Sequence, residues 1–168
     1  NRTDKAYEDF GSMELNDICT EYYARKRGRG HVAAGTVCQD YCLVKNIDDD
    51  TQIVCLADGH GGAEYTRSDR GSRLACEVFV SEAEKVKEMY APGFRRGNWM
   101  GYLRTPEFRD HFISEWREIA VIDCIIDDPE TKETDEKIVS KYGTTFLFAV
   151  CDREQICIGQ LGDGAILM

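Results

Sequence analysis

The stretch TQIVCLADGHGG, residues 51–62, joins an apolar run to an acid and a histidine. The run predicts a buried strand, Asp58 follows it directly, and His60 stands between two glycines. Functional side chains often lie where a rigid strand gives way to a loop, because the strand fixes their position. An Asp-Gly pair is also simply a good turn. The stretch therefore predicts either a plain turn or a carboxylate and an imidazole held for chemistry.

Two β-hairpins are predicted, and the first contains this stretch. Residues 39–47 (QDYCLVKNI) and 51–57 are rich in Val, Ile, Leu and Tyr, and an acidic turn separates them. Residues 144–152 (TTFLFAVCD) and 155–163 (QICIGQLGD) form the second pair. The last residues, 164–168, are expected to start a further strand.

Two helices are predicted between the hairpins. Apolar residues recur at helical spacing over residues 74–90, and proline and glycine in 91–98 end the pattern. A second apolar stripe covers residues 108–123, with Thr105-Pro106 at the expected helix start. The order hairpin, two helices, hairpin indicates an α+β fold with antiparallel sheet covered by helices.

Three segments are expected to lie outside these elements. Residues 1–27 show no clear period and are expected to be an extension or a helical lead-in. The acidic segment 127–137 is expected to be a loop. The basic run ARKRGRG, residues 24–30, is either a solvated loop or a contact for an anionic substrate.

Composition limits the classes of function. The net charge of −10 argues against a general nucleic-acid binder, because phosphate backbones need clustered Lys and Arg. We expect no membrane span, because the sequence has no apolar run near the required length, about 18 residues, and it has no signal-peptide pattern at its start. The eight cysteines include no CxxC pair, so reduced thiols and a cytoplasmic location are expected.

Three acids are predicted at strand ends. Asp58 and Asp163 are each followed by glycine, and Asp40 begins the first strand. If the strands bring them together, their oxygens could bind a hard cation such as Mg²⁺ or Mn²⁺. His60 can exchange a proton near neutral pH, whereas His111 is expected to be an ordinary helix residue.

Four blocks, in order, resemble the metal-dependent protein phosphatases of the protein phosphatase 2C (PP2C) family, in its bacterial-type branch. They are GHVAAGTVCQDYCLV (30–44), LADGHGG (56–62), YGTTFLFAV (142–150) and QLGDGAIL (160–167). The resemblance implies a four-layer αββα sandwich, in which helices flank two antiparallel sheets. It also implies removal of phosphate from phosphoserine and phosphothreonine in proteins, with two or three Mn²⁺ or Mg²⁺ ions.

The resemblance also implies roles for individual residues. Asp58 would bridge two metals, Gly59 would offer its backbone carbonyl to one of them, and Asp40 would support the site through bound water. Asp163 would help to hold a third metal. His60 would act as the general acid that protonates the leaving oxygen.

The chain departs from the family pattern at the expected phosphate-binding arginine, where it has Gly35. His31 or Arg29 is the expected substitute. Residues 30–168 would be the N-terminal part of the phosphatase domain, residues 1–29 an N-terminal extension, and the family's later Asp-Gly and Asp-Asn blocks are missing.

Three functions remain open from the sequence. The first is a phosphatase whose isolated fragment is inactive or binds metal weakly. The second is a pseudophosphatase that binds phosphoproteins or partners without turnover. The third is a domain whose Asp-Gly pairs are only turns. A sheet with an exposed strand edge would also favour an oligomer.

Overall fold

A computed structural model describes residues 8–15, 19–90 and 98–164 of the chain. The strands in this part are β1 (Glu8–Leu15), β2 (Cys19–Lys26), β3 (Tyr41–Asn46), β4 (Gln52–Ala57), β5 (Phe146–Cys151) and β6 (Ile156–Leu161). The helices are α1 (Arg29–Ala34), α2 (Ser68–Met89), α3 (Trp99–Tyr102), α4 (Pro106–Asp127) and α5 (Asp135–Ser140). The fold is therefore α+β, as predicted.

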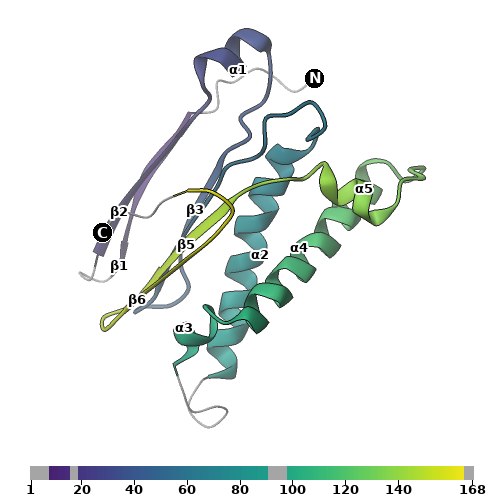
Figure 1. Cartoon of the computed structure of the whole chain (residues 1–168). Coiled ribbons are helices and arrows are strands. Elements are labelled where there is room, and N and C mark those ends of the chain that lie inside the picture. The colour runs from purple at the N-terminus through teal and green to yellow at the C-terminus, as the bar shows by residue number, and fades with distance from the viewer. Residues whose placement is uncertain (1–7, 16–18, 91–97, 165–168) are drawn as a thin grey trace.

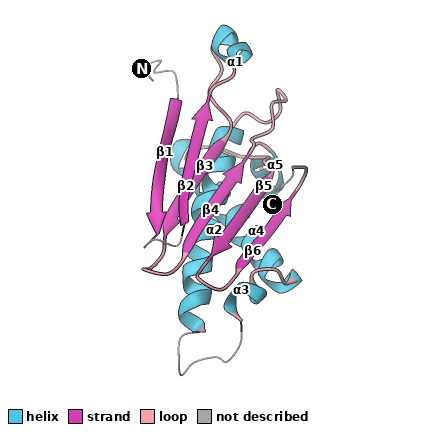
Figure 2. Cartoon of the chain, turned by 90° about the vertical axis from the view of Figure 1, so that its left-hand side faces the viewer, coloured by secondary structure: helices cyan, strands magenta, loops and turns pink. Residues whose placement is uncertain are grey.

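A four-stranded antiparallel sheet, in the order β3-β4-β5-β6, forms the centre of the fold. The long helices α2 and α4 come between β4 and β5 in the chain and lie on one side of this sheet (Figure 1). A separate hairpin of β1 and β2 lies on the other side and packs on β3 (Figure 2). The second full sheet of a four-layer sandwich remains a prediction.

The core lies between the sheet and the helices. Ile53 and Cys55 of β4 are fully buried on the helix side, while Leu56, which points to the opposite face, is 47% exposed. Phe79 of α2 is at the centre, with its ring 4.3 Å from that of Phe148 and 5.7 Å from that of Phe112, measured between centroids. Aromatic rings at these distances stabilise a core beyond the area they bury.

Both predicted helices are confirmed, and the second begins as its sequence indicates. Thr105 caps α4 by accepting a hydrogen bond at 3.2 Å from the amide of Phe108, and Pro106 takes the first helical position. The first helix starts earlier than the apolar stripe, at Ser68, because its first turn packs against polar loops instead of the core.

Some loop predictions were wrong. Residues 8–15 and 19–26 pair as the antiparallel strands β1 and β2, so the alternative of a helical lead-in is wrong for them. The acidic segment 127–137 includes the start of α5, whose first turn carries Asp135 and Glu136, where acids favour the helix dipole. The expected break at 91–97 and the strand expected at 165–168 lie outside the described residues.

Two bulk predictions concern the membrane and the cysteines. Within the described ranges, no helix is long and apolar enough to cross a membrane. The seven cysteines for which the structure gives a state, which excludes Cys19, are all free thiols.

Candidate functional site

The sheet topology brings the ends of four strands together at one end of the sheet. Tyr41 pairs with Ala57, and Phe146 pairs with Leu161, so β3 and β5 begin where β4 and β6 end. The residues that flank these strand ends are Asp40, Asp58, Thr144, Thr145 and Asp163. Because the strands are antiparallel, Asp40 and Asp163 lie at the same end of the sheet although they are 123 positions apart in the chain.

Asp40 and Asp58 form a pair of carboxyl groups at this end of the sheet. Burial raises the pKa of Asp40 most, and a side-chain hydrogen bond with Asp58 and the charge of Asp58 raise it further. Two carboxylates this close repel each other unless a proton or a cation lies between them. The arrangement is therefore suited to binding a positive ion.

The acid pair faces a cavity of about 380 Å³ between the β1–β2 hairpin and the sheet. Besides Asp40 and Asp58, its wall includes the basic residues Arg25 and Lys26 and the apolar side chain of Leu147. The cavity combines acids that can hold a cation with bases that can hold an anion.

Arg25 belongs to the basic run 24–30, for which contact with an anionic substrate was one of two predictions, but the sequence did not single it out. Its Nη1 donates a hydrogen bond at 3.3 Å to the carbonyl of Asp40, and its guanidinium carbon lies 4.9 Å from the centre of the Tyr41 ring. Its charge also lowers the pKa of Asp40, against the effect of burial. In the structure, exposure alternates from Tyr22 to Arg27 and puts Arg25 on the less exposed face, but the residues themselves, YYARKR, show no alternation of polar and apolar side chains that would have indicated this.

The backbone that carries Asp58 is fixed by the neighbouring strand. The carbonyl of Asp58 accepts hydrogen bonds from the amide of Thr145 at 2.9 Å and from Thr144 Oγ1 at 3.0 Å. The amide of His60 donates to the carbonyl of Gly143 at 3.0 Å. These contacts span an isolated bridge between Gly59 and Thr144 and do not use the carbonyl of Gly59.

Gly59 is needed because backbones approach closely here. A Cβ at this position would lie 2.6 Å from the carbonyl oxygen of Gln39 and 2.7 Å from that of Ser68. Gln39 Nε2 in turn donates to the carbonyl of His60 at 2.9 Å and to Ser68 Oγ at 2.7 Å. The loops before β3 and after β4 are thus locked to the first turn of α2.

The imidazole of His60 packs against Tyr65, with ring centroids 4.7 Å apart at an interplanar angle of 77°. A Cβ on Gly143 would lie 2.8 Å from His60 Nδ1, so the glycine makes room for the ring. His60 is half-buried and is not among the described residues that line the cavity of the acid pair. It lies two residues after Asp58 in the chain.

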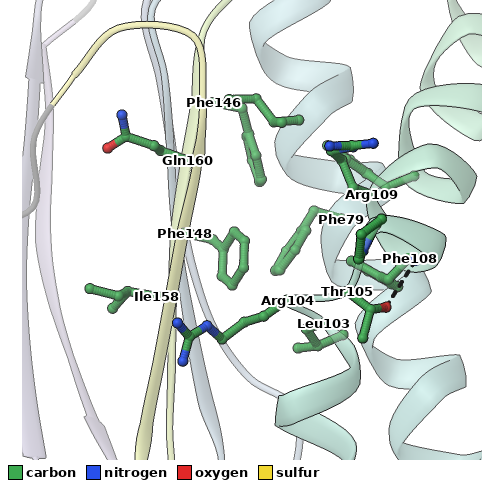
Figure 3. A pocket seen from close by; sticks show the side chains of 14 residues that line it. Phe79, Leu103, Arg104, Thr105, Phe108, Arg109, Phe146, Phe148, Ile158 and Gln160 are labelled. Atoms are coloured by element: carbon green, nitrogen blue, oxygen red, sulfur yellow. Dashed lines mark hydrogen bonds between the residues drawn. The ribbon is translucent and has the colours of Figure 1, made fainter.

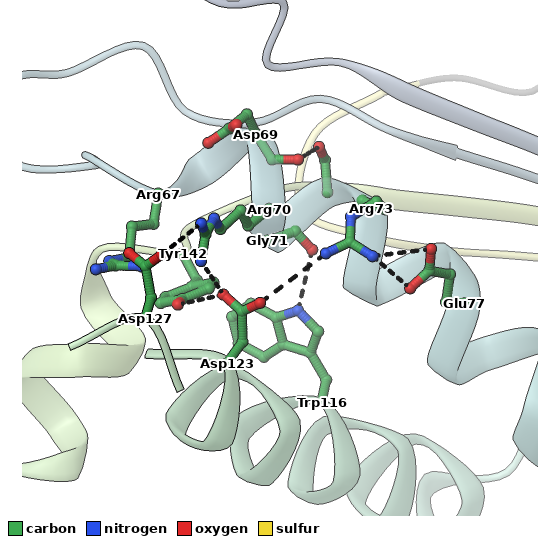
Figure 4. Close-up of polar contacts among 11 residues, drawn as sticks. Arg67, Asp69, Arg70, Gly71, Arg73, Glu77, Trp116, Asp123, Asp127 and Tyr142 are labelled. Atoms are coloured by element: carbon green, nitrogen blue, oxygen red, sulfur yellow. Dashed lines mark hydrogen bonds and ion pairs between the residues drawn. The ribbon is translucent and has the colours of Figure 1, made fainter. Parts of the chain in front are cut away.

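A polar network behind the site holds the segment before β5 (Figure 4). Tyr142 donates a hydrogen bond at 2.7 Å to Asp123 Oδ2, and Arg70 binds the same oxygen at 2.9 Å. Burial, then this hydrogen bond, raises the pKa of Tyr142. Trp116 Nε1 donates to the carbonyl of Gly71 at 3.1 Å, which ties α4 to α2.

The other predicted site residues are more dispersed. Asp163 is exposed after β6, beyond β5 from Asp58, or about 10 Å away across two strand spacings. His31 and Arg29 are exposed on α1, and the charge of His31 lowers the pKa of Asp40. His111, on α4, bonds the buried carboxylate of Glu82 at 2.8 Å.

Gly35 has a structural reason to replace the arginine that the family resemblance led us to expect. It ends α1 in the left-handed conformation, with φ of 67°, and its amide bonds back to the carbonyl of Val32 at 3.2 Å. A residue with a side chain is strained in this conformation, which glycine adopts freely. A basic residue for this cavity must therefore come from another position.

The donor set fits Mg²⁺ or Mn²⁺ in part. No group of three or more His, Cys, Asp and Glu side chains is arranged for a metal ion in the portion of the chain that the structure describes. The carboxylates of Asp40 and Asp58 and the backbone carbonyl of Gly59 offer oxygen atoms of the kind that these cations prefer. Mg²⁺ is often held by one or two carboxylates and several waters, so this pair is sufficient to begin such a site.

The geometry defines an α+β domain with an acid pair at one end of an antiparallel sheet. A family model described as Protein phosphatase 2C matches residues 27–168. The chain belongs to the protein phosphatase 2C family. Searches of curated proteins and of solved structures found no significant match.

Proposed function

We propose that this chain carries part of the catalytic centre of a protein phosphatase that hydrolyses phosphoserine and phosphothreonine in proteins. The observation that carries the proposal is that Asp40 and Asp58 line one cavity together with the basic residues Arg25 and Lys26. The family match over residues 27–168 supports it. The whole enzyme would work in the cytoplasm on phosphoproteins.

Asp58 and Asp40 would hold Mn²⁺ or Mg²⁺, with the carbonyl of Gly59 as a further ligand and Asp163 at a third, outer ion. When bound, the ions would supply a water of lowered pKa and neutralise phosphoryl oxygens. The chain's own part is to fix the carboxylates. The bonds from Thr144 and Thr145 to the carbonyl of Asp58 serve this purpose.

Arg25 is the residue in the cavity best suited to bind the substrate phosphate. Its planar guanidinium can bind two phosphate oxygens at once, and it lies beside the acid pair. His31 would add a second positive group, since its charge already acts on Asp40. For Arg29, the only support for a role in binding phosphate is its position in the basic run 24–30.

His60 would give a proton to the leaving serine or threonine oxygen, because an alkoxide is a poor leaving group. Tyr65 and Gly143 hold its ring. Since the ring lies outside the wall of the acid cavity, substrate must reach across the loop from Asp58 to His60. The proposal therefore places the leaving group on the His60 side of the phosphorus atom.

The test combines metal binding with turnover. Calorimetry with Mn²⁺ should detect binding to the chain, and Asp58→Asn should weaken it by at least about tenfold, as loss of metal-site groups typically does. Asp128→Asn, an exposed acid at the end of α4, is the matched control and should bind as the parent does.

Turnover is then measured on a phosphothreonine peptide with Mn²⁺, and with the metal removed by EDTA. Hydrolysis that persists in EDTA or survives Asp58→Asn would refute the proposed chemistry. Binding of Mn²⁺ and peptide without turnover by the whole enzyme that contains this chain would instead favour the pseudophosphatase.

A further inference from the structure

An apolar cavity of about 230 Å³ lies away from the acid pair, between β6 and the start of α4 (Figure 3). Its interior is formed by five phenylalanine rings. They are Phe79, Phe108, Phe112, Phe146 and Phe148. An apolar cavity of about 150 Å³ can already hold a benzene molecule. The space is therefore large enough for a phenyl or branched aliphatic side chain.

The cavity opens at the edge of the sheet. Ile158 and Gln160 point away from the helices (Figure 3). Gly159 and Leu161 pack on the core side of the strand, and all four residues line the cavity. Residues of both faces can line one cavity only where it reaches around the strand edge. Gly159 lets the Phe148 ring pack closely on β6, because a Cβ there would lie 2.4 Å from this ring.

A second apolar cavity, also of about 230 Å³, continues this one toward the catalytic end of the sheet. The two share Phe112, Phe146 and Leu161, and the second reaches Thr144. Thr144 Oγ1 is hydrogen-bonded to the carbonyl of Asp58 at 3.0 Å. We call the two cavities together the β6 groove.

Both charged residues that line the β6 groove are arginines, although the whole chain has a net charge of −10. Arg104 extends across the mouth toward β6 (Figure 3). Arg109 bonds Asp110 at 2.9 Å, but both side chains are more than half exposed, so this pair is easily exchanged for another acid. The mouth is suited to a carboxylate.

The strand β6 itself is suited to pairing. Within the described ranges it is an edge strand that pairs only with β5. Its sequence, ICIGQL, contains no charge and no proline, the features that usually protect an exposed edge. Ile156 is 64% exposed at its start.

We propose that the β6 groove binds an extended peptide segment of another protein, which adds a strand to β6. The segment places one aromatic or large aliphatic side chain among the phenylalanines and an acidic side chain on Arg104. Main-chain hydrogen bonds to the strand edge supply affinity, and the cavity and arginines supply specificity. A second copy of this chain is a poorer occupant, because two chains of net charge −10 repel each other. The inference is independent of the proposed catalytic activity.

The probe is a fluorescein-labelled peptide, TVTFTETV, in which phenylalanine and glutamate lie on the same face of a strand. Fluorescence anisotropy should show saturable binding to the chain. Replacing the phenylalanine by alanine or the glutamate by glutamine should weaken binding at least about tenfold, the effect of losing a buried anchor or a charge-assisted hydrogen bond. Two further peptides carry N-methyl groups on alternate backbone amides. Binding should be abolished when the methylated amides are those that pair with β6, and it should be retained when they are the amides that point away from β6.

On the protein side, Arg104→Ala should weaken binding of TVTFTETV at least about tenfold, because it removes the carboxylate partner. Arg117→Ala, which removes an exposed arginine of α4 outside the β6 groove, should have no effect. Both residues are exposed, so both variants should fold. Equal binding by the two variants, or by the peptide without phenylalanine, would overturn the proposal. A dimer by light scattering that the peptide cannot dissociate would assign the groove to a second copy instead.

Discussion

Gly71 of α2 should be the most sensitive glycine behind the site. A Cβ at this position would lie 1.9 Å from the backbone oxygen of Tyr142 and 2.7 Å from its carbonyl carbon. Neither atom is the end of a flexible side chain. In Gly71→Ala, α2 or the segment before β5 must therefore move by more than about 1 Å to restore an ordinary contact, and overpacking of this kind costs about 1–3 kcal/mol.

Two further effects nearly cancel. Alanine is favoured over glycine within a helix by about 1 kcal/mol. The hydrogen bond from Trp116 Nε1 to the carbonyl of Gly71, at 3.1 Å, would be disturbed, with a loss of about 1 kcal/mol. The net loss of unfolding free energy is then about 2 kcal/mol. For a domain of this size, that lowers the melting temperature by about 4–8 °C.

The assay is thermal unfolding of Gly71→Ala and of Gly101→Ala as the matched helical control. A Cβ on Gly101 would meet Asn98 Cγ at 3.5 Å, an ordinary contact, so this variant should melt at or slightly above the parent temperature. Hydrogen exchange at the His60 amide, which bonds the carbonyl of Gly143, should also become faster in Gly71→Ala. If Gly71→Ala melted within about 1 °C of the parent, the close approach of α2 to Tyr142 would be refuted.

Two other predictions concern stability. Burial favours the neutral form of Glu82, but hydrogen bonds from Lys85 and His111 hold its pKa below the usual value. The Glu82 carboxylate therefore stabilises the folded state at pH values above the pKa that Glu82 has in the unfolded chain. This stabilisation is lost as the pH falls through the lower pKa that Glu82 has in the folded state. Between pH 7 and pH 3 the melting temperature of Glu82→Gln should fall less than that of the parent. An equal fall for the two proteins would contradict this. On β4, Ile53→Ala should cost about 2–4 kcal/mol in urea unfolding, whereas Leu56→Ala, on the open face, should cost less than about 1 kcal/mol; equal losses would mean that the open face is covered.

Much of the fold could be read from local patterns. Runs rich in Val, Ile, Leu and aromatic residues predicted β3 to β6, and helical spacing with Thr105-Pro106 predicted α4 and its start. The β1–β2 hairpin was missed because its two strands mix polar and apolar residues without a clear period. The reason for Gly59 was also missed, since it depends on Gln39 and Ser68, which only the folded chain brings near it.

The sequence by itself determined the strand-end acids, the histidine between glycines and the membership of a phosphatase family, because these depend on residues close together in the chain. Only the tertiary structure decided that Asp40, Asp58 and Arg25 line one cavity, and that His60 is not among the described residues that line it. The physical reason is that antiparallel pairing and the packing of α2 against the loops set distances between residues far apart in sequence, and local patterns carry no record of those distances.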